Sequence, residues 1–178
     1  AMLDFSVVSF PELRALSLSR LHGRSKNLEN ISLSITNLTL DICDFNDFYW
    51  LSQHAPMLEH LHLCRLYSSN KLVNKQTNEP FPYLKKLIID DFIYASFDDF
   101  EQLVRFTPNL RNLTISAIEM DLIDAGRWEQ LITRSLLSLN TFQFKFSSSR
   151  YNVELDIMIP KLEEFQSDFW RKEHHWFT

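Results

Sequence analysis

Three residues with metal-binding side chains occupy alternate positions of one short segment. His60, His62 and Cys64 are each separated by a single residue, so in a β-strand their side chains point to the same face. Imidazole nitrogen and thiolate sulfur are ligands of Zn²⁺, and metal binding is the chemistry that this pattern could support. Side chains two residues apart on a strand, however, lie about 7 Å from each other, which is wide for two ligands that bind one ion at about 2 Å each. We therefore interpret these residues as polar members of a binding surface and keep a metal site at His60/His62/Cys64 as an alternative.

Motifs for catalysis or cofactor binding are absent from the sequence. It contains no serine in a nucleophile elbow and no His–Glu zinc-helix motif, and its two glycines, Gly23 and Gly126, cannot form a glycine-rich phosphate loop. The acidic pairs Asp90-Asp91, Asp98-Asp99 and Glu163-Glu164 are adjacent in sequence, so their members diverge in regular structure or cap helices. The sequence predicts a protein that is not an enzyme and needs no metal or cofactor.

The elements that must position these residues are indicated by a recurring apolar pattern, L-x-x-L-x-L. Its copies begin near residues 13, 35, 58, 84, 110, 139 and 162, at spacings of 22, 23, 26, 26, 29 and 23 residues. Five of these seven copies have a proline two residues before their first apolar position, where a preceding helix or loop must end. The prolines are Pro11, Pro56, Pro82, Pro108 and Pro160.

This periodicity predicts an α/β fold of the leucine-rich-repeat type. A repeat of 20 to 29 residues with this pattern is typical of a solenoid shaped like a horseshoe. We expect about six to seven repeats, with a parallel β-sheet on the concave side and helices and irregular loops on the convex side. The whole chain, 1–178, is then a single leucine-rich-repeat domain, and because no polar capping unit precedes the first repeat, we expect a fragment of a longer protein.

Helices are predicted in three of the segments that connect the strands. Ser96 and Asp99 form a capping-box pattern before Phe97, Phe100, Leu103 and Val104, which recur at helical spacing. Similar patterns predict helices from about 46 to 54 and from about 124 to 137. The seventh repeat is open, because either the alternating segment 153–159 or the segment 162–168 could be its strand.

Alternation along the predicted strands places a set of side chains on the outward, concave face, in three rows that run across successive strands. The first row contains Ala15, Asn37, His60, Lys86, Asn112 and Thr141, the middle row contains Ser17, Thr39, His62, Ile88, Thr114 and Gln143, and the third row contains Ser19, Asp41, Cys64, Asp90, Ser116 and Lys145. Most of them are small or polar, as a solvated binding surface requires. Aromatic residues that could anchor a partner are expected at the strand ends instead, at Tyr67, Phe92 and Tyr94. The predicted partner-binding residues are Asn37, Thr39, Asp41, His60, His62, Cys64, Lys86, Ile88, Asp90, Asn112, Thr114, Ser116, Gln143 and Lys145.

Composition excludes several classes of partner and compartment. The net charge is −5 and no run of five like charges occurs, so a nucleic-acid-binding surface is not indicated. No apolar stretch is long enough to cross a bilayer, and we expect no membrane association. The two cysteines, Cys43 inward and Cys64 outward, are predicted to stay unpaired, which indicates the cytoplasm or the nucleus.

Two segments resemble a known family. Phe-Pro-Glu-Leu-Arg-Ala-Leu-Ser-Leu at 10–18 and Thr-Pro-Asn-Leu-Arg-Asn-Leu-Thr-Ile at 107–115 resemble repeats of F-box/leucine-rich-repeat proteins, the substrate receptors of cullin-type ubiquitin ligases. The resemblance implies recognition of a protein substrate and contact with the ligase adaptor through an F-box. No F-box is present in this chain, so adaptor binding would require one upstream of Ala1.

The expected function is therefore a non-catalytic protein–protein interaction module. The concave face binds a protein partner, and by resemblance the module recognises the substrate of an F-box-type ubiquitin ligase. The alternatives are a structural scaffold domain within a larger protein and the metal site described above.

Overall fold

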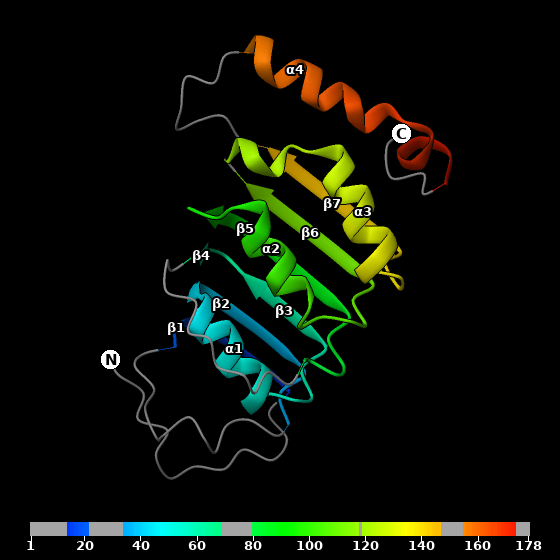
Figure 1. The fold of residues 1–178 in the computed structure, drawn as a ribbon. Helices are drawn as coiled ribbons and strands as arrows, with labels where there is room; N and C mark the ends of the chain where they lie inside the picture. The colour runs from blue at the N-terminus through cyan, green and yellow to red at the C-terminus, as the bar shows by residue number, and fades with distance from the viewer. Residues whose placement is uncertain (1–13, 22–33, 69–79, 118, 147–154, 174–178) are drawn as a thin grey trace.

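One parallel β-sheet organises the molecule. The structure, a computed structural model, describes residues 14–21, 34–68, 80–117, 119–146 and 155–173 (Figure 1). Within these residues seven strands form one sheet in the order β1-β2-β3-β5-β6-β7, in which the short β4 pairs with β2 and β5. All the pairs are parallel. The strands are β1 (Ala15–Arg20), β2 (Asn37–Asp44), β3 (His60–Leu63), β4 (Leu66–Tyr67), β5 (Lys86–Ile93), β6 (Asn112–Ala117) and β7 (Thr141–Phe146).

The apolar pattern sets the register of the strands, as the sequence predicted. The second apolar residue of each unit pairs with its counterpart on the next strand, so that Leu38, Leu61, Leu87, Leu113 and Phe142 form one row. All five of these side chains are buried. The residues between them face the opposite side of the sheet, because side chains alternate along a strand.

Three helices connect successive strands and cover the apolar face of the sheet (Figure 1). They are α1 (Phe45–His54), α2 (Phe97–Val104) and α3 (Ala125–Ser135), with a short 3₁₀ helix, η2 (Met120–Leu122), before α3. The predicted capping box at α2 is present, since Ser96 accepts a hydrogen bond from the Asp99 N–H and Asp99 accepts one from the Ser96 N–H. Asp44 and Asp47 form the same arrangement at α1, and the Asp124 side chain caps α3.

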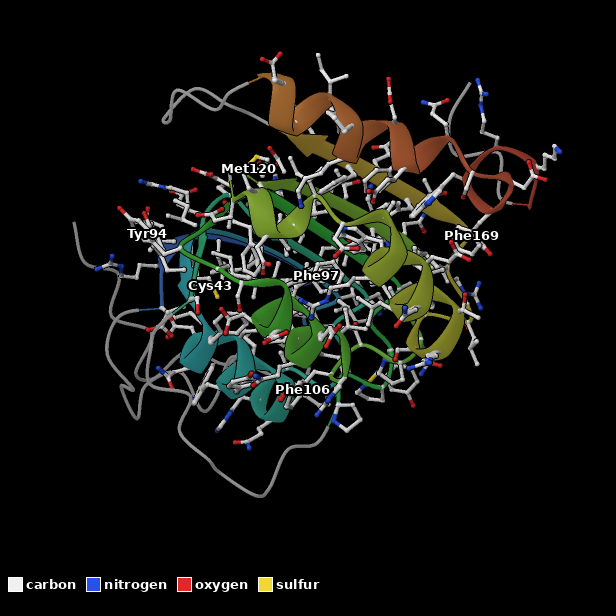
Figure 2. All side chains as sticks on the ribbon, turned by 45° about the horizontal axis from the view of Figure 1, so that its top comes forward. Cys43, Tyr94, Phe97, Phe106, Met120 and Phe169 are labelled. Atoms are coloured by element: carbon white, nitrogen blue, oxygen red, sulfur yellow. The ribbon has the colours of Figure 1, made fainter. Side chains whose placement is uncertain are left out.

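Aromatic rings fill the space between the helices and the sheet. Trp128 on α3 is fully buried and lies 5.1 Å from Phe97, 4.8 Å from Phe100 and 4.9 Å from Phe142, measured between ring centroids. Figure 2 shows Phe97 among the side chains that α2 contributes to this layer. Trp128 and Trp170 are both completely buried in this core, whereas Trp176 lies outside the described residues.

The predicted leucine-rich-repeat solenoid is wrong. The fold is α/β with a single parallel seven-stranded sheet, and this sheet is not wound into a solenoid or a horseshoe. A uniform curvature requires units of equal construction, but the connections here differ: α1 has 10 residues, α2 has 8 and α3 has 11. The apolar pattern therefore specified strands and their inward faces without specifying how the sheet bends.

The predicted seventh repeat is also wrong, because neither candidate segment forms a strand where the structure describes it, from residue 155 onward. Residues Leu155–Glu163 form helix α4, which includes Pro160. Two short elements follow it: a 3₁₀ turn, η3 (Glu164–Gln166), and a π-helical turn, η4 (Phe169–Glu173). Trp170 and Phe165 lie against Phe142 and Phe144 of β7, at 5.8 and 5.9 Å between ring centroids. The apolar residues of 162–168 thus close the core beside β7 instead of extending the sheet.

None of the helices in the described part of the chain combines the length and the apolar character that a membrane crossing needs.

Candidate functional site

Figure 1 shows α1, α2 and α3 on one face of the sheet. The predicted binding residues lie on the opposite face, because they alternate along the strands with the buried residues that face these helices. None of these side chains is buried. We call this surface the polar sheet face and define it by the predicted set: Asn37, Thr39, Asp41, His60, His62, Cys64, Lys86, Ile88, Asp90, Asn112, Thr114, Ser116, Gln143 and Lys145.

Strand pairing arranges the polar sheet face in rows. Asn37, His60, Lys86 and Asn112 occupy one row across β2, β3, β5 and β6. Thr39, His62, Ile88, Thr114 and Gln143 occupy the next row. The register that the sequence predicted for these two rows is therefore confirmed.

Neighbouring side chains within the polar sheet face bond to one another across strands. His60 Nδ1 lies 2.6 Å from Asn37 Oδ1, and the Thr114 hydroxyl donates to Gln143 Oε1 at 3.3 Å. His62 Nε2 lies 2.6 Å from Asp90 Oδ2. These bonds hold part of the surface in one arrangement before any partner arrives.

An extra residue interrupts the alternation at one level of three neighbouring strands. One set of buried residues pairs across the strands at Leu40, Leu63 and Ile89. The next buried set that pairs in this way is Cys43, Leu66 and Phe92, and each of its members comes three positions later in the chain instead of the usual two. On β6 the same step takes only two residues, from Ile115 to Ala117, so the register between β5 and β6 shifts. Such bulges turn side chains in directions that a regular strand does not allow.

The first residue of each irregular step lies on the polar sheet face, and these residues are Asp41, Cys64 and Asp90. Cys64 has Asp90 on one side and Asp41, within hydrogen-bonding range of its thiol, on the other. Partial burial raises the pKa of the Cys64 thiol, and the negative charges of Asp90 and Asp41 raise it further. The thiol is therefore held in its protonated form.

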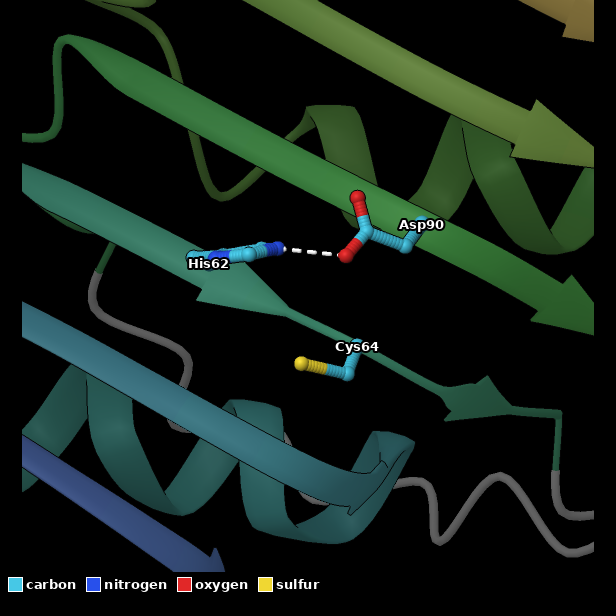
Figure 3. Close-up of side chains that lie close together, drawn as sticks. All are labelled: His62, Cys64 and Asp90. Carbon is cyan, nitrogen blue, oxygen red and sulfur yellow. Dashed lines mark hydrogen bonds and ion pairs between the residues drawn. The ribbon is translucent and has the colours of Figure 1, made fainter.

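The structure groups His62 and Cys64 with Asp90, and not with His60 as the sequence pattern indicated. One ligand atom from each of His62, Cys64 and Asp90 lies within 4.8 Å of the other two (Figure 3). The His60 imidazole instead bonds to Asn37. The predicted rows had already placed Asp41 and Asp90 on the strands beside Cys64. What the rows did not reveal is that Asp90 bonds to the imidazole of His62, 28 residues away in the sequence, and that His60 is not part of the group.

The second cysteine belongs to the core, as predicted. Cys43 is completely buried, and burial raises the pKa of its thiol well above the ordinary value, with a further contribution from Asp47 and Asp44. Both cysteines are free.

The aromatic anchors predicted at the strand ends have different environments. Phe92 is completely buried, so its predicted role as an anchor is wrong. Tyr67 is half-buried, and Tyr94, at the end of β5, is 68% exposed. Tyr94 has a φ of 54°, and its N–H donates to Glu119 Oε1 at 2.7 Å. A non-glycine residue is uncommon in this left-handed region, so the loop holds an exposed tyrosine in a conformation that carries a cost.

The helical side of the molecule contains a charged cluster that the sequence did not reveal. Arg127 on α3 lies 2.6 Å from Asp98 and 3.1 Å from Glu101 on α2, and its guanidinium is 4.2 Å from the centre of the Phe97 ring. Burial opposes the charged form of Arg127, but hydrogen bonds to both carboxylates outweigh it and raise the pKa. An open cavity of about 200 Å³ beside this cluster is lined by Glu101, Arg105, Gln130, Leu131, Arg134 and Ser135. The cluster ties two helices together and holds no arrangement of acid, base and nucleophile.

Comparison with known proteins returned no match to any family model, to any curated protein or to any solved structure.

Proposed function

We propose that this chain is a non-catalytic protein-binding domain and that its polar sheet face is the surface that binds the partner. The observation that carries the proposal is the arrangement of that face: successive strands present aligned rows of partly or fully exposed side chains on the side of the sheet opposite α1, α2 and α3.

Rigidity favours this surface for binding. Its side chains stand on paired strands whose inward neighbours are packed in the core, so little backbone freedom is lost when a partner binds. Several of its side chains are short, such as Thr39, Thr114 and Ser116, and short side chains lose little rotamer freedom. The cross-strand bonds of His60 and of Thr114 restrict the surface further.

The chemistry of the face indicates a polar partner surface of mixed charge. Asp41 on β2 and Asp90 on β5 are exposed acids, whereas Lys86, also on β5, and Lys145 on β7 are exposed bases. Alternating charges of this kind select one orientation of a partner and disfavour others. Tyr94 lies at the end of β5 and supplies the large ring that such a polar surface otherwise lacks.

A matched pair of substitutions tests the proposal. Thr114→Arg places a long, charged side chain in the middle row of the polar sheet face, and Thr133→Arg places the same side chain on the exposed surface of α3. Proteins captured from a cell extract by the wild-type domain are identified, and the affinity of each purified candidate is measured by calorimetry. Thr114→Arg is expected to weaken binding more than about 30-fold, the effect of disrupting a hot spot, and Thr133→Arg to change it less than about twofold.

Equal effects of the two substitutions, at unchanged stability, would contradict the assignment of the surface. Tyr94→Asn adds a second measurement, because asparagine tolerates the left-handed conformation better than most residues. This variant removes the ring without adding backbone strain, and we expect weaker binding with an unchanged unfolding midpoint.

The more specific function, substrate recognition for a cullin-type ubiquitin ligase, is supported by the resemblance of residues 10–18 and 107–115 alone. Recovery of a cullin adaptor with the longest natural form of this protein, purified from its own cells, would support it. Failure to recover an adaptor would remove the ligase function and leave the protein-binding proposal intact.

A further inference from the structure

The side chains of His62, Cys64 and Asp90 converge on one point of the polar sheet face. Figure 3 shows His62 and Cys64 on the same stretch of chain and Asp90 on the neighbouring strand, with its carboxylate directed towards the imidazole. Their ligand atoms lie within 4.8 Å of one another, and His62 Nε2 and Asp90 Oδ2 are 2.6 Å apart. Because of the irregular step in β5, Asp90 is at a point where a strand can turn a side chain towards its neighbour.

These separations are close to those of a bound zinc ion. Bonds of about 2.0 Å to nitrogen and oxygen and about 2.3 Å to sulfur in a tetrahedron place the ligand atoms about 3.3 to 3.5 Å from each other. The observed spread, from 2.6 Å to at most 4.8 Å, brackets this range. Changes of about 1 Å in the separations of the three ligand atoms would bring them to zinc-binding distances.

The donor types select the metal. A sulfur donor with an imidazole and one carboxylate is suited to Zn²⁺ and is unsuited to Ca²⁺ or Mg²⁺, which prefer oxygen ligands only. One thiolate and one carboxylate balance the charge of a divalent ion, while the imidazole binds in its neutral form. Binding releases the thiol proton to solvent.

We propose that His62, Cys64 and Asp90 form a Zn²⁺ site that joins β3 to β5 on the polar sheet face. The fourth position of the tetrahedron is open on the exposed side of the sheet, beside Asp41, and is filled by water. This proposal does not depend on the identity or the existence of a protein partner, because all three ligands belong to this chain.

Metal titration of the reduced chain tests the proposal. Zn²⁺ is titrated in competition with a chromophoric chelator, and Co²⁺ is added separately, because a cobalt–thiolate bond produces a charge-transfer absorption that carboxylate or imidazole ligation does not. One Zn²⁺ per chain and a cobalt–thiolate band are expected, whereas Ca²⁺ should not compete. A wild-type chain that binds no Zn²⁺, or that binds Co²⁺ without this band, would overturn the site.

The sequence offers matched controls for two of the three ligands, at one or two residues from His62 and Asp90. His62→Gln and Asp90→Asn remove ligands, and His60→Gln and Asp91→Asn make the same chemical changes on the same strands. Cys64→Ser removes the sulfur donor. His174→Gln with His175→Gln removes the two neighbouring histidines near the end of the sequence.

The ligand variants are expected to weaken Zn²⁺ binding by at least about 10-fold, since even loss of a group that only supports a ligand costs this much. His60→Gln, Asp91→Asn and the His174/His175 pair should stay within about twofold of the wild type. Circular dichroism confirms that each variant is folded. The assignment would be refuted if His62→Gln and Asp90→Asn left the Zn²⁺ affinity unchanged. It would also be refuted if the His174→Gln/His175→Gln variant no longer bound Zn²⁺.

Discussion

Trp128 connects α3 to the last strand of the polar sheet face, and its replacement by phenylalanine is the most direct test of the core. Its indole is fully buried, and its Nε1–H donates to the Leu122 carbonyl at 2.8 Å. Its ring lies 4.9 Å from Phe142 and 5.3 Å from Phe144, between centroids. These two phenylalanines alternate with Gln143 and Lys145 of the polar sheet face. Trp128 therefore packs against β7 on the side of the sheet that faces the helices.

The cost of Trp128→Phe has two parts. A buried carbonyl left without its hydrogen bond costs about 1–3 kcal/mol, and the void left by the smaller ring costs about 1–2 kcal/mol. We therefore expect a loss of about 2–5 kcal/mol in the free energy of unfolding. Replacement of Trp128 by alanine is unsuitable as a test. Loss of the buried ring alone would cost about 3–5 kcal/mol, which approaches the total stability of many domains, about 5–15 kcal/mol.

Urea unfolding followed by far-ultraviolet circular dichroism measures this loss, and Trp50→Phe is the control. Trp50 on α1 is half-buried and stacks on His54 at 4.0 Å, so the same substitution there should cost less than about 1 kcal/mol. If Trp128→Phe costs no more than Trp50→Phe, Trp128 is not the anchor of β7 and our reasoning fails.

Two further predictions concern local interactions. The hydrogen bond from Lys85 at 2.8 Å and the positive charge of Lys85 lower the pKa of Glu59 from its ordinary value of 4.5; the pair therefore stabilises the fold above pH 4.5 and loses this effect as pH falls through the lowered pKa. Thermal unfolding should show that the unfolding temperatures of wild type and Glu59→Gln converge below the lowered pKa of Glu59. A difference in unfolding temperature that stays constant with pH would contradict the pairing. Ser96→Ala, which removes the cap of α2, should lower the free energy of unfolding by about 1 kcal/mol, whereas Ser138→Ala, in the exposed turn after α3, should not change it measurably.

Much of the candidate surface could be predicted because the information for it is local. An apolar residue at every second position of a strand defines the inward face, and the residues between them must face outward. This reasoning placed Asn37, His60 and Lys86 in one row, and strand pairing confirms that row. The capping pattern at Ser96 predicted the start of α2 in the same way, because a cap depends on residues three positions apart.

The shape of the sheet and the grouping of its chemistry could not be predicted in this way. Curvature depends on how α1, α2 and α3 pack, and these helices differ in length although the strand pattern recurs. The apolar residues of 162–168 resembled another strand, but their packing against Phe142 and Phe144 decided in favour of helical turns. Local propensity is weak enough for tertiary contacts to override it.

The sequence by itself determined which side chains are inward, which are outward and where three helices begin, because these properties depend on residues a few positions apart. Only the tertiary structure decided that the sheet is not a horseshoe, that residues 155–173 close the core beside β7, and that the imidazole of His62, and not that of His60, meets Asp90. The last of these depends on strand pairing over 28 residues of chain and on a bulge in β5. A contact of that kind exists only when the whole sheet has formed.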